Sequence, residues 1–485
     1  MSSFTPQPRL SASTLNAHLV EMQYSVRGRV LEVATALKAQ LLADPSSLPF
    51  DEVVSCNIGN PQALGQRPPP FNRQVLSLMV NPELISTAPG AFLPQALARA
   101  KAYLESVKVG AYSGSQGVEC VRVEVAAFIA RRDGCPADKD SVFLTNGASD
   151  GVKALMQACI RGGDQRDGVL VPIPQYPLYS AVTTLYDGEL LGYHLDEAAD
   201  WSMTTGELAR AADEASARGV NVRGLVVINP GNPTSQQLTR ASMEQVVTFC
   251  EARGLVLMAD EVYQDNLYGT AAGTFVSFKK VVVEMASQVQ LVSFHSVSKG
   301  FTGECGTRGG YFELHNIAPD VKQQLYKLAS ISLCSNLLGQ LAVGLMVNPP
   351  TEGEALAMHV AHKETILASL EWRQKQLVAT LNTMAGVSCT DLKGSLYAFP
   401  QIALPAAAVA EARKEGIEPD LFYCLALLQR TGIVTVPGSG FKQKEGTFHF
   451  RITILPPKEQ FADIMGKLKS FHAGFMEEYG GASSL

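Results

Sequence analysis

The chain has 485 residues, of which 46% are hydrophobic and 18% charged, and its formal net charge is −6. This composition is typical of a globular protein long enough for two domains, and it excludes a disordered or fibrous chain. Because no basic block stands out along the sequence, we do not expect nucleic acid as a partner.

The cysteines and apolar runs indicate the compartment. Nine cysteines between Cys56 and Cys424 form no C-x-x-C pair, so neither a disulfide framework nor a thiolate zinc site is expected. No apolar run approaches the ~20 residues that cross a bilayer, which excludes a transmembrane helix. We expect a cytoplasmic protein, with a mitochondrial presequence as the alternative because the first acid is Glu21.

Short β-branched runs alternate with helical patterns through the middle of the chain. This alternation predicts an α/β fold, a mostly parallel sheet flanked by helices. The clearest predicted strands are 141–144, 169–173, 225–228, 255–258 and 291–294.

A change of pattern after Pro350 divides the chain. We predict a long interdomain helix at about 353–384, followed by short strands near 394–399 and 447–454. The expected organisation has three parts. Residues 1–90 form an N-terminal arm and part of a smaller α+β domain, residues 91–348 form the large domain, and residues 349–485 form the interdomain helix and the rest of the small domain.

Polar or Gly/Pro-rich segments follow several predicted strands. They are 145–147, 174–177, 229–233, 260–261 and 295–296. Ligands of open α/β sheets bind outside the carboxyl ends of the strands, so we expect these segments to converge on one crevice.

Lys299 follows a predicted buried strand. A desolvated lysine forms Schiff bases with aldehydes, although a lysine after a strand is more often a solvated loop residue. The neighbouring Ser296, Ser298 and Arg308 are the donors that hold a phosphate. For the serines, turn or cap chemistry is the alternative. Together these residues predict a site for a cofactor with an aldehyde and a phosphate.

Two further segments resemble parts of a cofactor site. Residues 146–151 precede a predicted helix, whose N-terminus favours an anion, although Ser149 or Asp150 could instead cap that helix. Asp260 ends a predicted strand three residues before Tyr263, and its carboxylate could keep a pyridine nitrogen protonated or cap a following helix.

A stiff turn at 229–234 fixes Asn232, whose amide could bond a phenolic oxygen of the cofactor. A plain tight turn is the other interpretation. In this order, the segments at 146–149, 229–234, 260–263 and 296–299, followed by Arg308 and Arg451, resemble the aspartate-aminotransferase superfamily of fold-type-I pyridoxal-phosphate enzymes. The resemblance covers essentially the whole chain.

The resemblance implies a role for each segment. Lys299 would bind the aldehyde of pyridoxal 5'-phosphate and act as the catalytic base, and Asp260 would pair with the ring nitrogen. Arg451 would bind the substrate carboxylate, although a solvent-facing strand arginine is the alternative. The remaining implied cofactor contacts are ring contacts by Tyr263, Asn232 and Tyr176, and phosphate contacts by Ala148, Ser149, Ser296, Ser298 and Arg308.

Three stretches, 295–311, 57–62 and 437–441, are similar to the signature of the alanine aminotransferases. This similarity implies transamination of L-alanine and 2-oxoglutarate to pyruvate and L-glutamate by a ping-pong mechanism. It also implies a homodimer, with Gly59 near the substrate carboxylate, Asn232 in contact with the substrate as well as the cofactor, and Tyr112 near the cofactor phosphate of the neighbouring subunit.

Three other functions are weighed against this one: an aminotransferase for another amino acid, a pyridoxal-phosphate lyase, and a regulatory protein that binds the cofactor without catalysis. His359 and His362, three residues apart on the predicted long helix, invite a metal site. Because no carboxylate or cysteine accompanies them, a solvated helix face is the better interpretation, and no metal is expected.

Overall fold

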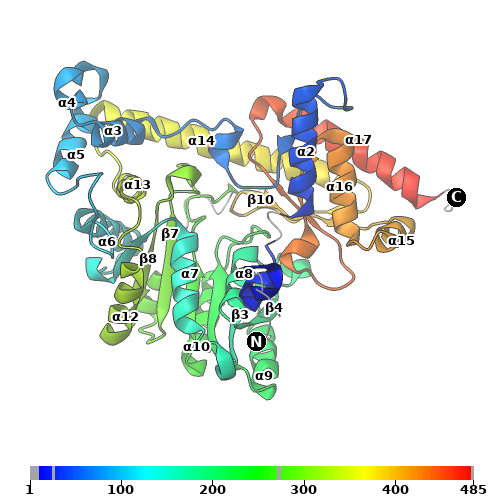
Figure 1. Cartoon of the computed structure of the whole chain (residues 1–485), viewed down its shortest axis with the longest axis horizontal. Coiled ribbons are helices and arrows are strands. Elements are labelled where there is room, and N and C mark those ends of the chain that lie inside the picture. The colour runs from blue at the N-terminus through cyan, green and yellow to red at the C-terminus, as the bar shows by residue number, and fades with distance from the viewer. Residues whose placement is uncertain (1–9, 25–27, 270–274, 482–485) are drawn as a thin grey trace, which may run out of the picture.

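The computed structural model describes residues 10–24, 28–269 and 275–481, and a seven-stranded sheet forms the centre of this part of the chain (Figure 1). The presequence prediction depends partly on residues 1–9, which lie outside the described ranges. Among the helices described, none combines the length and apolarity needed to span a membrane.

The central sheet confirms the α/β prediction. Its strand order is β2-β8-β7-β6-β5-β3-β4, and β8 alone runs in the direction opposite to that of the other six strands. Each of the five predicted strands is present within a few residues of its expected bounds; β4 and β8 complete the sheet. The strands are β2 (Val142–Thr145), β3 (Asp167–Ile173), β4 (Glu189–His194), β5 (Asn221–Ile228), β6 (Val256–Asp260), β7 (Leu291–Ser296) and β8 (Gly310–His315).

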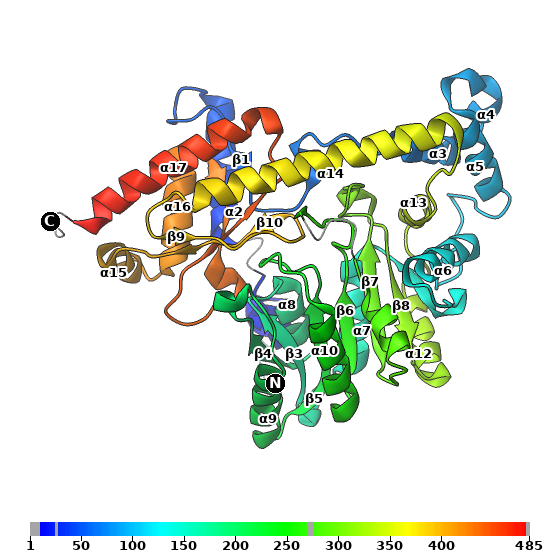
Figure 2. The same cartoon turned by 180° about the vertical axis from the view of Figure 1, so that it is seen from behind.

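Helices cover both faces of the sheet, which is why its inner strands are apolar on both sides. One core joins Val169 and Val171 of β3 to α7, α8 and α12, and another joins Leu170 to α9, α10 and α11. Figure 1 shows α7 in front of the sheet, and Figure 2 shows α10 in front from behind. These helices are α7 (Ala148–Cys159), α8 (Pro177–Leu185), α9 (Thr205–Ala217), α10 (Arg240–Arg253), α11 (Phe278–Glu284) and α12 (Pro319–Ser330).

A third core lies beside β2 and β8. It is formed by α3 (Pro70–Val80), α5 (Pro94–Leu104), α6 (Glu119–Asp133) and α13 (Leu337–Val347). The short helix α1 (Ala17–Glu21) precedes these helices in the chain, and the short helix α4 (Leu84–Thr87) lies between α3 and α5.

The fourth core combines distant parts of the sequence. It joins residues 30–56 to residues 370–475, so the two ends of the chain pack together. The helix α14 (Gly353–Leu381), close to the predicted 353–384, extends from α3 and α5 to this core (Figures 1 and 2). The other elements are α2 (Arg29–Ala43), α15 (Ala406–Lys414), α16 (Pro419–Thr431), α17 (Lys458–Gly480), β1 (Val54–Ser55), β9 (Val387–Ser388), β10 (Tyr397–Ala398), β11 (Gln401–Ile402), β12 (Ile433–Val434), β13 (Val436–Pro437) and β14 (Phe450–Thr453).

Candidate active site

A cavity of about 430 Å³ lies at the carboxyl ends of the central strands, where a parallel sheet binds its ligands. It brings together all the predicted site residues except Tyr112. The predicted residues that line it are Gly59, Ala148, Ser149, Tyr176, Asn232, Asp260, Tyr263, Ser296, Ser298, Lys299, Arg308 and Arg451.

Lys299 lies on the turn after β7 and projects into this cavity. Its Nζ donates to the carbonyl oxygen of Gly59 at 3.0 Å and lies 5.7 Å from the ring centroid of Tyr263. Because Gly59 comes from the N-terminal part of the chain, the contact joins the large sheet to the fourth core. The lysine is therefore a half-buried cavity residue rather than a solvated one.

One end of the cavity is built to hold an anion. The N-cap of α7 is Gly147, at φ 77°, and no side chain caps the helix, so its first N–H groups are available to a ligand. Neither Ser149 nor Asp150 is the cap. The Nη2 of Arg308 donates to the Asn146 carbonyl oxygen at 3.1 Å, and a Cβ on Gly147 would lie 2.3 Å from that same nitrogen. Only glycine leaves room for the guanidinium here.

The two serines lie at this same end of the cavity. Ser296 Oγ donates to Ser298 Oγ at 3.1 Å and accepts the backbone N–H of Ser298, also at 3.1 Å. Ser298 Oγ in turn accepts a 3.4 Å contact from Arg308. The turn interpretation of the serines is thus correct in part, and the same hydroxyls still lie beside the Arg308 guanidinium.

Asp260 ends β6 at the cavity floor and is 5% exposed. The Tyr179 hydroxyl donates to its Oδ2 at 2.9 Å, while its Oδ1 is buried without a partner. Burial raises the pKa of Asp260 to about 6, although the Tyr179 hydrogen bond opposes the rise. The carboxyl is therefore mostly ionised at pH 7 and has one oxygen free to pair with a cation.

Arg451 on β14 is 2% exposed, which excludes the solvent-facing alternative. Its guanidinium lies between two aromatic rings, 4.1 Å from the centroid of Tyr397 and 4.7 Å from that of Phe441. Nη1 donates to Asn232 Oδ1 at 3.1 Å, and Nη2 donates to the Asn57 carbonyl oxygen. The rings and these bonds fix a planar cation at the wall of the cavity, the geometry that suits a carboxylate.

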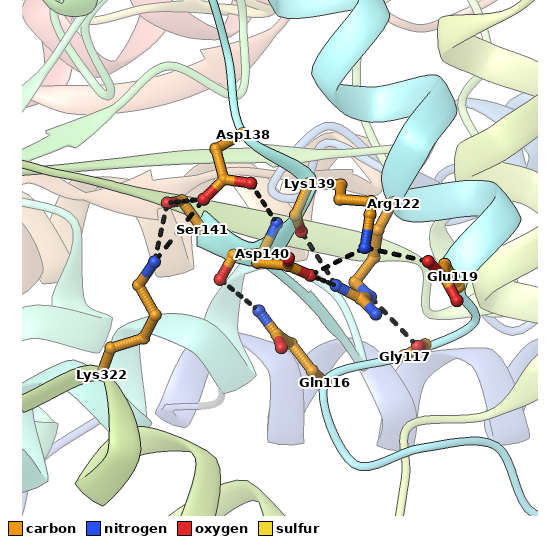
Figure 3. Close-up of polar contacts among 9 residues, drawn as sticks. All are labelled: Gln116, Gly117, Glu119, Arg122, Asp138, Lys139, Asp140, Ser141 and Lys322. Atoms are coloured by element: carbon orange, nitrogen blue, oxygen red, sulfur yellow. Dashed lines mark hydrogen bonds and ion pairs between the residues drawn. The ribbon is translucent and has the colours of Figure 1, made fainter. Parts of the chain in front are cut away.

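Tyr112 lies outside the cavity and is 78% exposed. The chain just after it is fixed by polar contacts (Figure 3). Gln116 Nε2 donates to the Asp140 carbonyl oxygen at 2.9 Å, and Arg122 bonds both the Gly117 carbonyl oxygen and the Asp140 carboxylate. An exposed tyrosine is thus carried by a loop whose far end is anchored at the start of β2.

Several residues that line the cavity or contact its lining were not among the sequence predictions, and four of them make polar contacts there. Tyr179 orients Asp260, Tyr24 contacts the Tyr176 hydroxyl at 3.3 Å, and both Tyr397 and Cys305 lie close to Gly59. Tyr179 could have been found, since it lies three positions after Tyr176 on a predicted helix. The other three depend on packing between distant segments.

His359 and His362 lie on α14, and the ring of His359 packs edge-on against Phe301 with centroids 5.4 Å apart. Within the described ranges, no cluster of three or more His, Cys, Asp or Glu side chains is arranged to hold a metal.

The sequence matches the aminotransferase class I and II family over residues 84–468. It is 48% identical to a probable mitochondrial alanine aminotransferase of Dictyostelium discoideum, covering 94% of this chain and 88% of that protein. It is 46% identical to glutamate–glyoxylate aminotransferase 1 of Arabidopsis thaliana, covering 97% of each. The structure superimposes on an alanine aminotransferase of Pyrococcus furiosus with a TM-score of 0.74 at 22% identity, covering 95% of this chain and 100% of that one. The chain therefore belongs to the class I and II aminotransferases and, within them, is closely related to the alanine aminotransferases.

Proposed function

We propose that this enzyme is a pyridoxal-phosphate-dependent alanine aminotransferase that converts L-alanine and 2-oxoglutarate to pyruvate and L-glutamate. The observation that carries the proposal is the presence of Lys299, Asp260, Arg308 and Arg451 around one cavity. The alanine aminotransferases among its relatives, similar over nearly the full length, support the choice of alanine.

The cavity fits the cofactor on two observations. Oδ1 of Asp260 is buried without a hydrogen-bond partner, and the protonated pyridine nitrogen of the cofactor would supply one. At the other end, the uncapped α7 and the Arg308 guanidinium form a cradle that a Cβ on Gly147 would fill. Lys299 would hold the aldehyde, Asn232 and Tyr263 the ring hydroxyl, and Tyr176 one ring face. Ala148, Ser149, Ser296, Ser298 and Arg308 would hold the phosphate.

When bound, the cofactor supplies an electron-accepting ring for the negative charge that develops at the substrate α-carbon. Arg451 binds the substrate carboxylate, with Gly59 beside it, and so orients the α-carbon toward the amine of Lys299. Once the substrate's amino group has displaced it from the aldehyde, that amine would take the proton from the α-carbon and deliver it to the cofactor carbon that carried the aldehyde. Positioned proton transfer of this kind contributes roughly 10²–10⁴-fold to a rate.

The test is the absorbance of the purified, cofactor-loaded protein before and after L-alanine, with pyruvate measured in the same tube. We expect the bound cofactor's band to shift, one pyruvate to form per site, and 2-oxoglutarate to restore the band. A band that ignores alanine would exclude alanine as donor. Because alanine has no β leaving group, pyruvate formed from L-serine with an unshifted band would favour a lyase.

Glyoxylate is a second candidate for the amino acceptor, because the relatives include glutamate–glyoxylate aminotransferases at 45–46% identity. With L-glutamate as donor, comparing kcat/KM for glyoxylate and for pyruvate distinguishes the two acceptors. A preference for glyoxylate over pyruvate of tenfold or more would replace the alanine assignment.

A homodimer completes the site in this proposal. Tyr112 is exposed on an anchored loop and contributes nothing to the cavity of its own chain, as expected of a residue that serves the neighbouring subunit. Light scattering should give twice the mass of one chain. Co-expressed Lys299→Ala and Tyr112→Ala chains should regain activity that neither variant has alone, because one mixed site then holds both native residues. Activity that does not exceed that of the separate variants would contradict the shared site.

Compartment and domain boundaries are also proposals. All nine cysteines are free, which favours a reducing compartment, and we place the enzyme in the cytoplasm with mitochondria as the alternative. Cell fractionation decides between the two. We also propose the division at residues 90 and 349, supported by the packing of residues 30–56 with residues 370–475 in the fourth core. Limited proteolysis should then cut first near these positions.

A further inference from the structure

Tyr397 lies close to two of the cations of the cavity, Lys299 and Arg451, although no motif of the sequence marked it. It belongs to β10, is 2% exposed, and its ring lies under the Arg451 guanidinium at 4.1 Å. Its hydroxyl accepts the backbone N–H of Gly59 at 3.1 Å. The amine of Lys299 donates to the carbonyl oxygen of that same Gly59 at 3.0 Å. One glycine therefore holds the tyrosine on its N–H and the lysine on its carbonyl.

The Tyr397 hydroxyl and the Lys299 amine pack directly against Gly59 and leave no room for a side chain there. A Cβ built there would lie 2.3 Å from the Tyr397 hydroxyl oxygen and 3.1 Å from Lys299 Nζ. Both polar atoms thus lie within contact distance of a single point beside the Gly59 backbone. A shift of Gly59 would move the acceptor of the lysine amine.

The backbone also ties Tyr397 to the substrate-binding arginine. β10 pairs with β14, so that Tyr397 is opposite Thr453 and Ala398 is opposite Ile452, one residue after Arg451. Ser235 donates to the Tyr397 carbonyl oxygen and fixes this strand to the turn after Asn232. Tyr397 is therefore held at its backbone by both the small sheet and the cofactor side of the cavity.

The charges on either side strengthen the hydroxyl as an acceptor. Burial alone would raise the pKa of Tyr397, but the positive charges of Lys299 and Arg451 outweigh burial and hold it below its ordinary value. A lowered pKa favours the phenolate form, whose oxygen accepts a hydrogen bond more strongly than a neutral hydroxyl does. The Gly59 N–H donates to this hydroxyl, and a hydrogen bond with Tyr263 also helps to lower its pKa.

We propose that Tyr397 is a positioning residue for the transamination proposed above: its hydroxyl fixes Gly59, and Gly59 holds the Lys299 amine on the side of the cavity where Arg451 binds the substrate. The tyrosine touches the backbone that carries the acceptor of the amine, and it transfers no proton itself. Its removal should slow proton transfer more than it weakens substrate binding.

The experiment compares Tyr397→Phe, which keeps the ring under Arg451, with Tyr268→Phe. Tyr268 is also buried, but it lies outside the cavity. Like Tyr397→Phe, its substitution by phenylalanine removes one hydrogen bond to the backbone, the bond from the Tyr268 hydroxyl to the Ser395 carbonyl oxygen at 2.6 Å. Single turnovers of cofactor-loaded protein are followed by absorbance with L-alanine and with α-deuterated L-alanine. We expect Y397F to be slower by about tenfold or more, part of the ~10²–10⁴-fold that positioned proton transfer supplies. Its apparent affinity for alanine should stay within threefold, and its deuterium isotope effect should rise.

A second measurement does not depend on turnover. The rate at which cofactor-free protein captures pyridoxal phosphate reports the attack of the Lys299 amine, and it should fall at least fivefold in Y397F and stay unchanged in Y268F. Replacement of Tyr397 by 3,5-difluorotyrosine keeps the oxygen and lowers its pKa further, so the capture rate of this protein should stay near that of the parent, in contrast to Y397F.

Some outcomes overturn the proposal. They are a Y397F protein with parental turnover, isotope effect and capture rate, a difluorotyrosine protein that is slowed as much as Y397F, or a loss confined to alanine affinity. If the parent itself makes no pyruvate from alanine, the proposed function fails instead. In that case, the single-turnover rates of Y397F and Y268F with L-glutamate as donor, together with the capture rates of the two variants, decide the role of Tyr397.

Discussion

Glu261, next to Asp260, carries a prediction on stability. It is 1% exposed; its Oε1 accepts the Phe278 N–H at 2.7 Å, while its Oε2 has no partner. Burial raises the pKa of Glu261 from 4.5 to about 8, even though Arg132 lies close enough to oppose the rise. A carboxyl whose pKa is raised in the folded state binds a proton that the unfolded chain releases. The free energy of unfolding therefore falls as pH rises from about 4.5 to about 8.

The size of this loss follows from the two pKa values. Integrating proton binding between pH 6 and pH 9 gives a loss of about 3 kcal/mol from this one carboxyl. Glu261→Gln stays neutral at every pH and keeps an oxygen for the Phe278 N–H. The free energy of unfolding of E261Q relative to the parent should thus improve by about 3 kcal/mol from pH 6 to pH 9.

Urea unfolding followed by circular dichroism at the two pH values measures this gap. Comparing variant with parent at each pH cancels the other titrating groups, and the exposed Glu354→Gln provides the matched control. The difference in the free energy of unfolding between E354Q and the parent should be the same at pH 6 and pH 9. If the difference in the free energy of unfolding between E261Q and the parent is also the same at both pH values, Glu261 remains charged in the folded protein and the argument from burial is wrong.

Three further substitutions test the proposed site. Lys299→Ala should lower the rate of pyruvate formation at least ~10²-fold, and activity within tenfold of the parent would remove the lysine as base. Arg451→Lys keeps the charge but loses the planar pair of donors, so KM for alanine should rise about 10–100-fold, the loss of one hydrogen bond to a charged group; an unchanged KM would refute the carboxylate role. Tyr179→Phe removes the donor that lowers the pKa of Asp260, leaving the carboxyl less ionised at pH 7. The dissociation constant of the cofactor, measured by fluorescence titration, should rise about tenfold, and an unchanged value would show that Asp260 needs no support from Tyr179.

Local signals in the sequence were sufficient for the central sheet and for most of the cavity. The five predicted strands are apolar because helices cover both of their faces, and their polar ends mark the ligand edge wherever the sheet is parallel. Lys299, Asp260 and Asn232 follow strands directly, so locating the strands also locates these side chains.

Contacts between distant segments could not be predicted in this way. Tyr397 lies in a short buried strand whose apolar neighbours indicate only a core position. Its role depends on Gly59, 338 positions away, and on the packing of the two chain ends into one core. Tyr24 meets Tyr176 for a similar reason, across 152 positions. No local periodicity encodes such pairs.

The two acids at the end of β6 show how strongly the sheet decides their chemistry. Asp260 and Glu261 are neighbours in sequence, and successive side chains of a strand point to opposite faces. Asp260 therefore reaches the cavity, where burial raises its pKa only to about 6 because the Tyr179 hydroxyl opposes the rise, and it is mostly ionised at pH 7. Glu261 reaches the opposite face, where it lies with Ser293, His295 and Tyr311 and is mostly protonated. The pairing of Asp260 with Ile228 of β5 and Phe294 of β7 fixes which acid faces which side. A slip of one residue in β6 would exchange the two environments and place the wrong acid at the cofactor.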